Sequence, residues 1–388
     1  MIEFKLPSLG SDMDQGKLLA WHVKPGDAVA RGQVVAVVDT SKAAVDVEAW
    51  NEGTVLELVV QPGETVPVGA VLATLIEPGE TPEHARQAPR SPRAAVAAPA
   101  VPEGAAAQLP AAAPPGRRRV SPAARKHAED AGIDIDTVAG TGPDGAVTLQ
   151  DVERAIHAPP PAPVEADRQR EMRKSIAAAM SRSKREIPHY YLSETVPMRR
   201  AQDWLAAANA RRPVTERVLM AALQLKAVAL ALQDYPDLNG FYRDGAHQAS
   251  AQVHVGVAIA LRQGGLIAPA LFDVATKPLE QLMRELSDLV RRARAGSLRS
   301  SEMSAPTITV TNLGDQGVEA VFGVIYPPQV ALVGFGRIAE RAWAGDGGLF
   351  CMPVTTASLA ADHRVSDGHR GALFLASLRE RLQHPDEL

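Results

Sequence analysis

Asp362-His363-Arg364-Val365-Ser366-Asp367-Gly368 follows the strand-like run of residues 353–360 and stands close to the C-terminus of this 388-residue sequence. A histidine ionises near neutral pH, so His363 can serve as a general base. Asp367 comes four residues later and can hold the local geometry, while Gly368 permits a tight backbone bend. The stretch therefore places a candidate acid–base group directly after a predicted strand.

Residues 168–388, which we call the third module, are long enough to bury a sizeable core, and helix and strand patterns alternate along them. Apolar spacing near 3.6 residues predicts helices over Arg173–Arg185, Glu216–Leu232 and Leu279–Ala295. Strand-like runs cover Tyr190–Val196, Val253–Ala260, Thr307–Val310, Val330–Phe335 and Pro353–Ala360. This mixed α/β pattern predicts a large sheet covered by helices.

Five more segments of the third module carry a specific resemblance: residues 187–190 (IPHY), 235–239 (YPDLN), 264–269 (GGLIAP), 309–314 (TVTNLG) and 327–329 (PPQ). In this order, together with Asp362–Gly368, they resemble the catalytic domain of dihydrolipoamide acyltransferases, through nearly all of residues 170–388. The resemblance implies the fold of chloramphenicol acetyltransferase. It also implies trimers with an active site between neighbouring subunits, and assembly into a 24-mer or 60-mer core.

The resemblance also implies a reaction, in which an acyl group passes between the sulfur of dihydrolipoamide and that of coenzyme A. A free thiol titrates at about pH 8.5, so a base helps, and the family assigns that role to the histidine matching His363. Thr311 stands where the family commonly has Ser, and its hydroxyl can stabilise the developing oxyanion. Asp367 is expected to order the segment through an ion pair. Pro306 stands near a position where the family usually has a glycine pair, and it stiffens the approach to Thr311.

Residues 1–78, the first module, contain an internal repeat. Residues 23–36 align with residues 60–73 at a constant offset of 37 (60 − 23). Valines near a period of two, separated by Pro-Gly pairs and single glycines, indicate short strands and turns. Two copies predict an all-β flattened barrel or sandwich with pseudo-two-fold symmetry.

Between the two copies, strand-like runs flank Asp39-Thr40-Ser41-Lys42, which puts Lys42 at the tip of a predicted hairpin. The first module resembles the lipoyl domain of 2-oxo acid dehydrogenase complexes, and the resemblance implies that Lys42 carries lipoic acid in amide linkage. A biotin carrier is the near alternative. That family usually has Met on both sides of its lysine, whereas Ser41 and Ala43 stand here.

Two Ala/Pro-rich stretches, residues 79–116 and 157–167, predict extended linkers because they cannot bury a core. Between them, residues 117–156 form the second module. Ser121-Pro122 predicts the start of a helix that Gly132 ends, and a second helix is predicted over Leu149–Ile156. About forty residues suit a small all-α docking module better than an enzyme.

The second module resembles the peripheral subunit-binding domain of the same complexes, which implies dihydrolipoamide dehydrogenase or the 2-oxo acid decarboxylase as partner. Arg125 and Lys126 match basic positions in that family's first helix. Glu129 and Ala146 stand where the family often has Arg, which weakens an electrostatic contact. The upstream arginines of residues 117–119 can compensate.

The composition excludes several function classes. A net charge of −4 and a pI near 6.2 argue against binding to nucleic acid or to an anionic membrane. Cys351 is the single cysteine; it rules out an internal disulfide, indicates a reducing compartment, and is predicted to be buried. No signal peptide, membrane-spanning run or metal-ligand spacing is evident. We therefore expect a cytoplasmic protein.

Two functions from different classes fit these observations. The first is an acyltransferase that forms the core of a 2-oxo acid dehydrogenase complex, with acetyl as the first expected acyl group and a branched-chain acyl as the second; the motifs also suit succinyl. The alternative is a non-catalytic lipoyl-bearing subunit that anchors dihydrolipoamide dehydrogenase. The presence of His363 argues against it.

Overall fold

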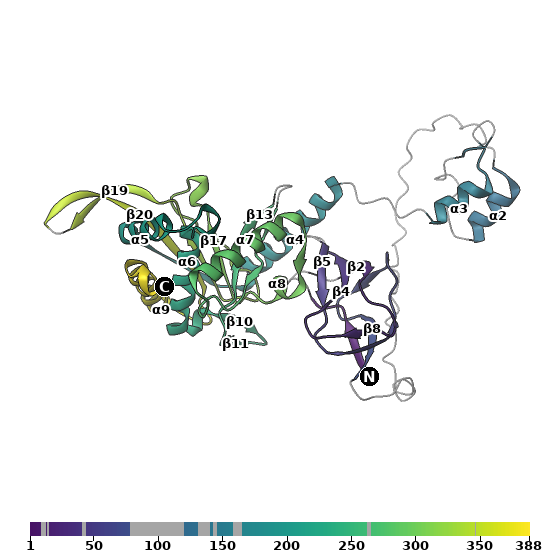
Figure 1. Cartoon of the computed structure of the whole chain (residues 1–388), viewed down its shortest axis with the longest axis horizontal. Helices are drawn as coiled ribbons and strands as arrows, with labels where there is room; N and C mark the ends of the chain where they lie inside the picture. Colours follow the sequence, from purple (N-terminus) through teal and green to yellow (C-terminus); the bar gives the residue numbers. More distant parts are fainter. Residues whose placement is uncertain are drawn as a thin grey trace. The chain divides into compact units, whose positions relative to one another are not determined.

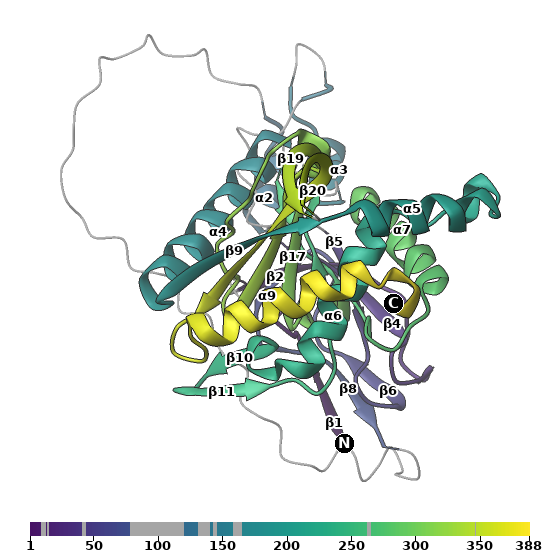
Figure 2. The same cartoon turned by 90° about the vertical axis from the view of Figure 1, so that its left-hand side faces the viewer.

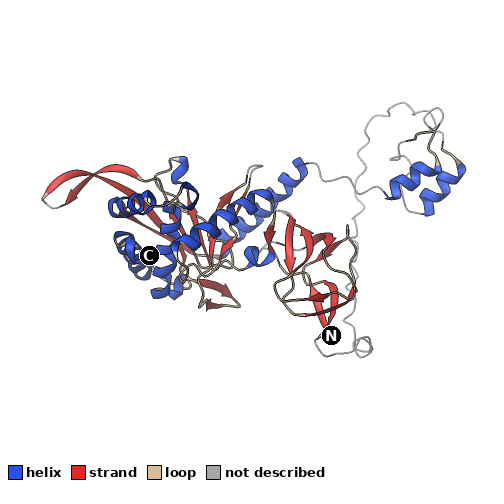
Figure 3. Cartoon of the chain, viewed as in Figure 1, coloured by secondary structure: helices blue, strands red, loops and turns tan. Residues whose placement is uncertain are grey.

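The computed structural model describes residues 1–8, 13, 15–40, 44–77, 120–130, 140–142, 146–157, 165–261, 265–345 and 347–388. The chain divides into two compact units. One unit contains residues 1–90 and 165–388, and the other contains residues 91–164. Figure 1 gives the element labels, and Figure 3 shows that the first module consists of strands and the second of helices.

The first module is a sandwich of short antiparallel strands, as the repeat predicts. One sheet has the order β1-β8-β6-β3, and the other contains β5-β4-β2-β7 and continues onto β16 of the third module. Its core is rich in valine and includes the fully buried Leu18 and Leu72. The strands are β1 (Ile2–Lys5), β2 (Gln15–Trp21), β3 (Ala28–Val29), β4 (Val34–Asp39), β5 (Ala44–Glu48), β6 (Gly53–Leu58), β7 (Thr65–Pro67) and β8 (Val71–Ile76).

Four glycines confirm that the repeat is structural. Gly26 and Gly63 have φ of 97° and 100°, and Gly32 and Gly69 have φ of 81° and 85°. Only glycine adopts such angles readily, so each copy turns at equivalent residues. Between the copies, β4 and β5 pair as far as Asp39 and Ala44. Lys42 falls in this connection and lies outside the described residues.

The second module packs α2 (Pro122–Asp130) against α3 (Leu149–His157). Ser121 Oγ accepts a hydrogen bond from Ala124 N at 3.2 Å, which is the predicted N-cap. The predicted stop at Gly132 lies outside the described residues. The small core consists of Ala124, Ala128, Val147 and Val152.

Asp151, which the sequence analysis did not single out, holds the second module together. Its carboxylate is 2% exposed and accepts hydrogen bonds from the backbone N–H and the hydroxyl of both Thr141 and Thr148. The backbone hydrogen bond from Thr141, and then that from Thr148, lower the pKa of Asp151. One buried carboxylate thus joins the start of α3 to the preceding loop.

A seven-stranded sheet of order β15-β12-β17-β18-β20-β19, with β9 also paired to β20, forms the centre of the third module. The adjacent strands β12, β17 and β18 are parallel, and β20 is antiparallel to β18, β19 and β9. The strands are β9 (His189–Pro197), β10 (Gly240–Arg243), β11 (Ala246–Ala249), β12 (Val255–Val257), β13 (Ile259–Ala260), β14 (Leu266–Ile267), β15 (Ala270–Leu271), β16 (Leu298–Arg299), β17 (Ile308–Asn312), β18 (Ala331–Phe335), β19 (Ala339–Gly345) and β20 (Gly348–Asp362).

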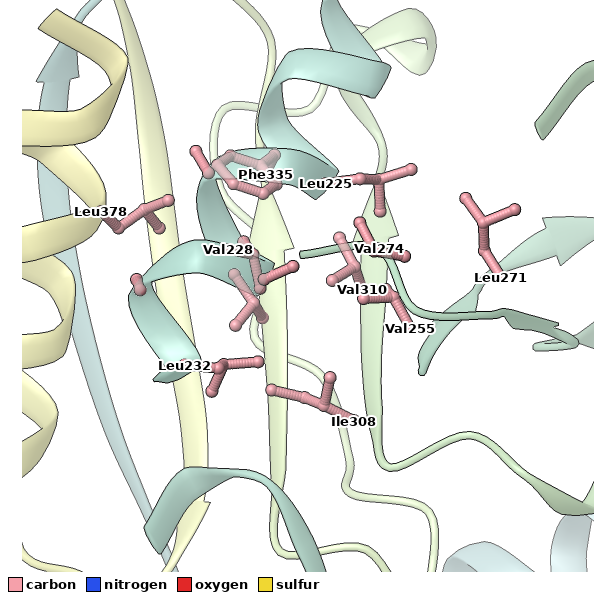
Figure 4. Packing of buried hydrophobic residues seen from close by; sticks show 14 of the residues in the cluster. Leu225, Val228, Leu232, Val255, Leu271, Val274, Ile308, Val310, Phe335 and Leu378 are labelled. Carbon is pink, nitrogen blue, oxygen red and sulfur yellow. The ribbon is translucent and has the colours of Figure 1, made fainter. Parts of the chain in front are cut away.

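Helix α6 is almost wholly buried over this sheet, and α9 packs against α6 and β9 (Figure 2). Figure 4 shows Leu225, Val228 and Leu232 of α6 lying over apolar side chains of β12, β17 and β18. The helices are α4 (Glu165–Glu186), α5 (Arg199–Ala210), α6 (Met220–Asp234), α7 (Leu279–Ala295), α8 (Ser300–Ser304) and α9 (Gly368–Gln383), with short 3-10 turns at η3 (Val214–Glu216), η4 (Pro236–Leu238), η5 (Gly314–Gln316) and η6 (Pro385–Glu387).

The prediction for Cys351 is wrong. β20 begins at Gly348 and forms a hairpin with β19 that extends away from the helices in Figure 1, and Cys351 is exposed on this hairpin. Elsewhere in the described part of the chain, no helix is long and apolar enough to cross a membrane, and no group of His, Cys, Asp and Glu residues there could hold a metal ion.

Candidate active site

His363 lies in the turn that follows β20, and its side chain is exposed. Its backbone N–H donates to the carbonyl of Pro188 at 3.0 Å, which fastens the turn to the start of β9. The imidazole meets the ring of Tyr190 edge-on, with 5.2 Å between ring centroids, and the Tyr190 hydroxyl lies 2.8 Å from that of Ser366. The turn therefore holds the imidazole against an aromatic ring while leaving it open to a partner.

Asp362, the last residue of β20, holds the same turn in place. Its carboxylate is fully buried and accepts hydrogen bonds from the Arg364 guanidinium, at 2.9 and 3.1 Å from Nε and at 2.6 Å from Nη2. The guanidinium also lies over the ring of Tyr242, 3.9 Å from its centroid. These hydrogen bonds raise the pKa of Arg364. This pair was not predicted from the sequence, although an acid at the end of an apolar run with an arginine two residues later is a usable signal.

Asp367 orders the segment by capping a helix rather than through the expected ion pair. Its Oδ1 accepts from Arg370 N at 3.0 Å at the N-terminus of α9. This backbone hydrogen bond, followed by one from His369, lowers the pKa of Asp367. The adjacent ion pair is made by Arg370 with Asp237, at 2.6 Å. Asp367 thus fixes where α9 begins, directly behind His363.

Thr311 lies near the end of β17. The following residue, Asn312, donates to Gln224 Oε1 of α6 at 2.7 Å and accepts from Gly314 N at 2.8 Å, so the strand end is firmly held. Within the described residues, the Thr311 hydroxyl makes no hydrogen bond. A held but unengaged hydroxyl can donate to a reacting oxygen.

The sheet registers keep Thr311 and His363 of one chain apart. Thr311 pairs with Gly334 of β18, and Gly334 pairs with Ser358 of β20. His363 comes five residues after Ser358 along the same strand direction (363 − 358), which is about 16 Å at about 3.3 Å per residue. Two strand spacings lie between them as well. A site that uses both side chains must therefore combine two copies of the chain.

Two further histidines of the third module, His189 and His254, make hydrogen bonds inside the fold. His189 Nε2 accepts from Ile325 N at 3.1 Å, and its Nδ1 lies 2.8 Å from the carbonyl of Ile187. His254 Nδ1 accepts from Asp273 N at 3.1 Å. Burial lowers the pKa of both imidazoles. Both rings are therefore engaged inside the fold. His369 differs from them, because its side chain is exposed on α9.

The candidate docking residues Arg125 and Lys126 lie next to each other on α2, and both side chains are exposed. Glu129 and the arginines of residues 117–119 have side chains outside the described part of the chain. The second module therefore offers a solvent-facing pair of cations.

Three family models match successive parts of the chain. Residues 2–75 match the model described as "Biotin-requiring enzyme", which covers biotin and lipoyl domains, and residues 118–153 match the e3 binding domain. Residues 162–388 match the 2-oxoacid dehydrogenases acyltransferase catalytic domain, which is more than half of the chain.

Relatives extend this match over the full length. The chain is 33% identical to the dihydrolipoyllysine-residue acetyltransferase component of the pyruvate dehydrogenase complex of Rhizobium meliloti, with 99% of this chain and 98% of the relative covered. It is 32% identical to the lipoamide acyltransferase component of the branched-chain alpha-keto acid dehydrogenase complex of Pseudomonas aeruginosa, over the same shares.

Two solved structures resemble the chain at a TM-score of 0.52 and 27% identity, each covering 58% of this chain and 97% of its own. One is the cubic core of a pyruvate dehydrogenase multienzyme complex. The other is the dihydrolipoamide acetyltransferase of Azotobacter vinelandii, studied for the role of a serine, a histidine and an asparagine in its catalytic mechanism. They confirm the fold class predicted for the third module.

The fold and the site together define an acyltransferase that carries its own lipoyl domain and subunit-binding domain. The chain belongs to the 2-oxoacid dehydrogenase acyltransferase family.

Proposed function

We propose that the chain transfers an acyl group from S-acyl-dihydrolipoyl-Lys42 to coenzyme A as the core of a 2-oxo acid dehydrogenase complex. The reaction takes place between two copies of the chain, with His363 from one copy and Thr311 from the next. The observation that carries this proposal is the sheet register, which leaves the exposed imidazole of His363 and the unengaged hydroxyl of Thr311 on strands two spacings apart and about 16 Å apart along the strand direction within each copy.

Sequence spacing supports the assignment of the three residues. In the Azotobacter vinelandii enzyme, the histidine comes 52 residues after the serine and four before the asparagine. Here His363 comes 52 residues after Thr311 (363 − 311) and four before Asp367 (367 − 363). The hydroxyl is kept, with an added methyl group, and a carboxylate replaces the amide. Because Asp367 caps α9, either side chain can accept the hydrogen bond from the backbone N–H.

Each side chain has a defined task. His363 takes the proton from the thiol of coenzyme A, which makes the sulfur a nucleophile at neutral pH. Thr311 donates a hydrogen bond to the thioester carbonyl oxygen as negative charge develops there. The protonated imidazole then returns its proton to the departing dihydrolipoyl sulfur. Asp362, Arg364 and Asp367 act by fixing the turn that carries the imidazole.

The first module suits a lipoyl group on Lys42. The pairing of Asp39 with Ala44 leaves residues 40–43 as the connection between β4 and β5, and Lys42 is within it. A lipoyl group supplies a sulfur that carries the acyl group from one active site to another. The curated relatives, whose names specify dihydrolipoyllysine or lipoamide, favour lipoate over biotin. A streptavidin blot of the purified chain tests the biotin alternative.

Acyl specificity is best tested with free dihydrolipoamide. The acetyl and branched-chain relatives are 33% and 32% identical, so identity does not separate the two substrates, and we keep acetyl first and branched-chain acyl second. The experiment compares acetyl-CoA, isobutyryl-CoA and succinyl-CoA as donors to free dihydrolipoamide. Preference for one donor names the parent complex. No transfer from any donor by assembled particles would favour the non-catalytic anchoring subunit.

Replacing the Thr311 hydroxyl tests its role directly. We expect Thr311→Val to lower the turnover number for free dihydrolipoamide by about 10²- to 10³-fold, because a donor to the oxyanion is lost while volume is kept. Thr311→Ser is the matched control and should keep most of the activity. Equal activity of the valine and threonine enzymes would remove Thr311 from the mechanism.

We also propose that α2 docks dihydrolipoamide dehydrogenase, or the decarboxylase, through Arg125 and Lys126. Reversing both charges to Glu should raise the dissociation constant about tenfold, because the attraction between these two cations and acidic groups of the partner is lost. The dissociation constant should also depend less on salt concentration. The control reverses Lys24 and Arg31, which are exposed on the first module. Calorimetry that finds the same affinity for wild type and the α2 variant would contradict this docking surface.

The proposed compartment is the cytoplasm. The chain has one cysteine, which is exposed on the β19–β20 hairpin, so it forms no internal disulfide. A fold without disulfides suits a reducing compartment such as the cytoplasm.

A further inference from the structure

The lipoyl domain is joined to the third module by an edge strand. β5 and β16 pair in parallel, with Val45 opposite Leu298 and Asp46 opposite Arg299. β5 is otherwise the outer strand of its sheet, so its outward N–H and C=O groups need a partner or water. β16 supplies that partner over two residues.

Glu48, at the end of β5, makes the most specific contacts of this junction. Its backbone N–H donates to Ser300 Oγ at 3.1 Å. Its carboxylate accepts from the Ser301 hydroxyl at 2.5 Å and from Ser301 N at 3.3 Å. Glu48 is 9% exposed and Ser300 is fully buried, so their polar groups have hydrogen bonds within the junction in place of hydrogen bonds to water. Burying a carboxylate in this way is costly unless hydrogen bonds compensate, and here they do.

Apolar contact and a shared cavity complete the junction. Met303 of α8 packs against both the core of the first module and the core of the third. A cavity of about 190 Å³ is lined by Ser8 from the first module and by Met303, Pro306 and Thr309 from the third. Thr309 precedes Thr311 by two residues on β17, so the two side chains lie on the same face of the strand. The strand that carries Thr311 therefore forms part of the cavity wall.

We propose that β16 and the start of α8 form a docking site for the chain's own lipoyl domain, recognised through the β5 edge and Glu48. Docking holds the carrier beside the cavity on β17, where its acyl cargo is delivered; this second part rests on the proposed function. The contact is small, with two paired residues and a few hydrogen bonds to Ser300 and Ser301, so the carrier can leave again. Tethering within one chain compensates for weak affinity through effective concentration.

Ser301→Glu tests the docking site by placing a second carboxylate against Glu48. The readout is acylation of the reduced, lipoylated first module by the preferred acyl-CoA within intact particles, beside acylation of free dihydrolipoamide by the same particles. We expect the first rate to fall about tenfold, the size of losing hydrogen bonds to a charged group, and the second to stay unchanged. Ser287→Glu, exposed on α7, adds the same charge elsewhere and should change neither rate.

A charge swap guards against a folding defect. Glu48→Lys alone should lower acylation of the lipoyl domain, and combining it with Ser301→Glu should restore the rate by forming an ion pair. Unchanged acylation of the lipoyl domain in both single variants, or no recovery in the double variant, would overturn the docking site. Failure of the wild type to acylate free dihydrolipoamide would instead contradict the proposed function, so the two failures are distinguishable.

Discussion

His363→Ala should lower acyl transfer to free dihydrolipoamide by about 10²- to 10⁴-fold, the usual contribution of a positioned general base. The thiol of coenzyme A is largely protonated at neutral pH, and the variant lacks the imidazole that we propose takes up its proton. The loss should be in the turnover number rather than in the Michaelis constant, because the imidazole accepts the proton in the transition state and does not contribute to substrate binding. Steady-state kinetics with purified particles measures both.

His369→Ala is the control, since this exposed histidine lies six residues further along, on α9. It should leave the turnover number unchanged. Light scattering and intact mass should show that both variants assemble and carry lipoate as the wild type does. If the His363→Ala enzyme turned over at the wild-type rate, the base would have to be sought elsewhere.

Lys42→Arg should abolish oxidation of the 2-oxo acid by the reconstituted complex. A guanidinium keeps the charge but offers no amine that can form an amide with lipoic acid, so the carrier is never loaded. Transfer to free dihydrolipoamide should be unaffected, because that substrate bypasses the lipoyl domain. This combination separates the carrier function from the transferase function within one chain.

The measurement pairs intact mass, which should lose the lipoyl increment, with overall turnover. Lys24→Arg is the matched control on the exposed surface of the first module and should keep both. A lipoyl increment that persists in the Lys42→Arg chain would place the attachment site on another lysine.

Sequence patterns predicted most of the buried elements of the third module because their periodicity is set by the core. Helix α7 begins and ends at the predicted residues, Leu279 and Ala295. The helix predicted from Glu216 begins only at Met220. Asn209 of α5 exchanges two hydrogen bonds with the backbone of Val218, which holds the approach extended. These hydrogen bonds, between residues nine apart in the sequence, override the helix propensity of residues 216–219.

The β19–β20 hairpin was not predicted for a different reason. Most residues of its outer part are exposed on both faces, so the sequence shows no alternation with a buried side. The prediction for Cys351 was wrong for the same reason. Cysteine is usually buried, but Cys351 lies on a part of β20 that packs against no core.

The candidate site residues were named from motifs, and the resemblance implied a site shared between neighbouring subunits. His363 and Thr311 were named from the sequence, whereas their separation within one chain follows from the register of β17, β18 and β20. Asp367 was expected to form an ion pair and instead caps α9. The pairing of Asp362 with Arg364 depends on burial at the strand end, which a linear pattern does not display.

The central claim is that the active site combines His363 of one copy with Thr311 of another, and mixing two inactive variants tests it most directly. Chains with His363→Ala and chains with Thr311→Val are unfolded together, reassembled in equal amounts, and assayed with free dihydrolipoamide. If copies mix at random, roughly one interface in four pairs an intact His363 with an intact Thr311, and activity should reappear to about that extent. Mixed particles that stay as inactive as their parents would contradict a site shared between copies.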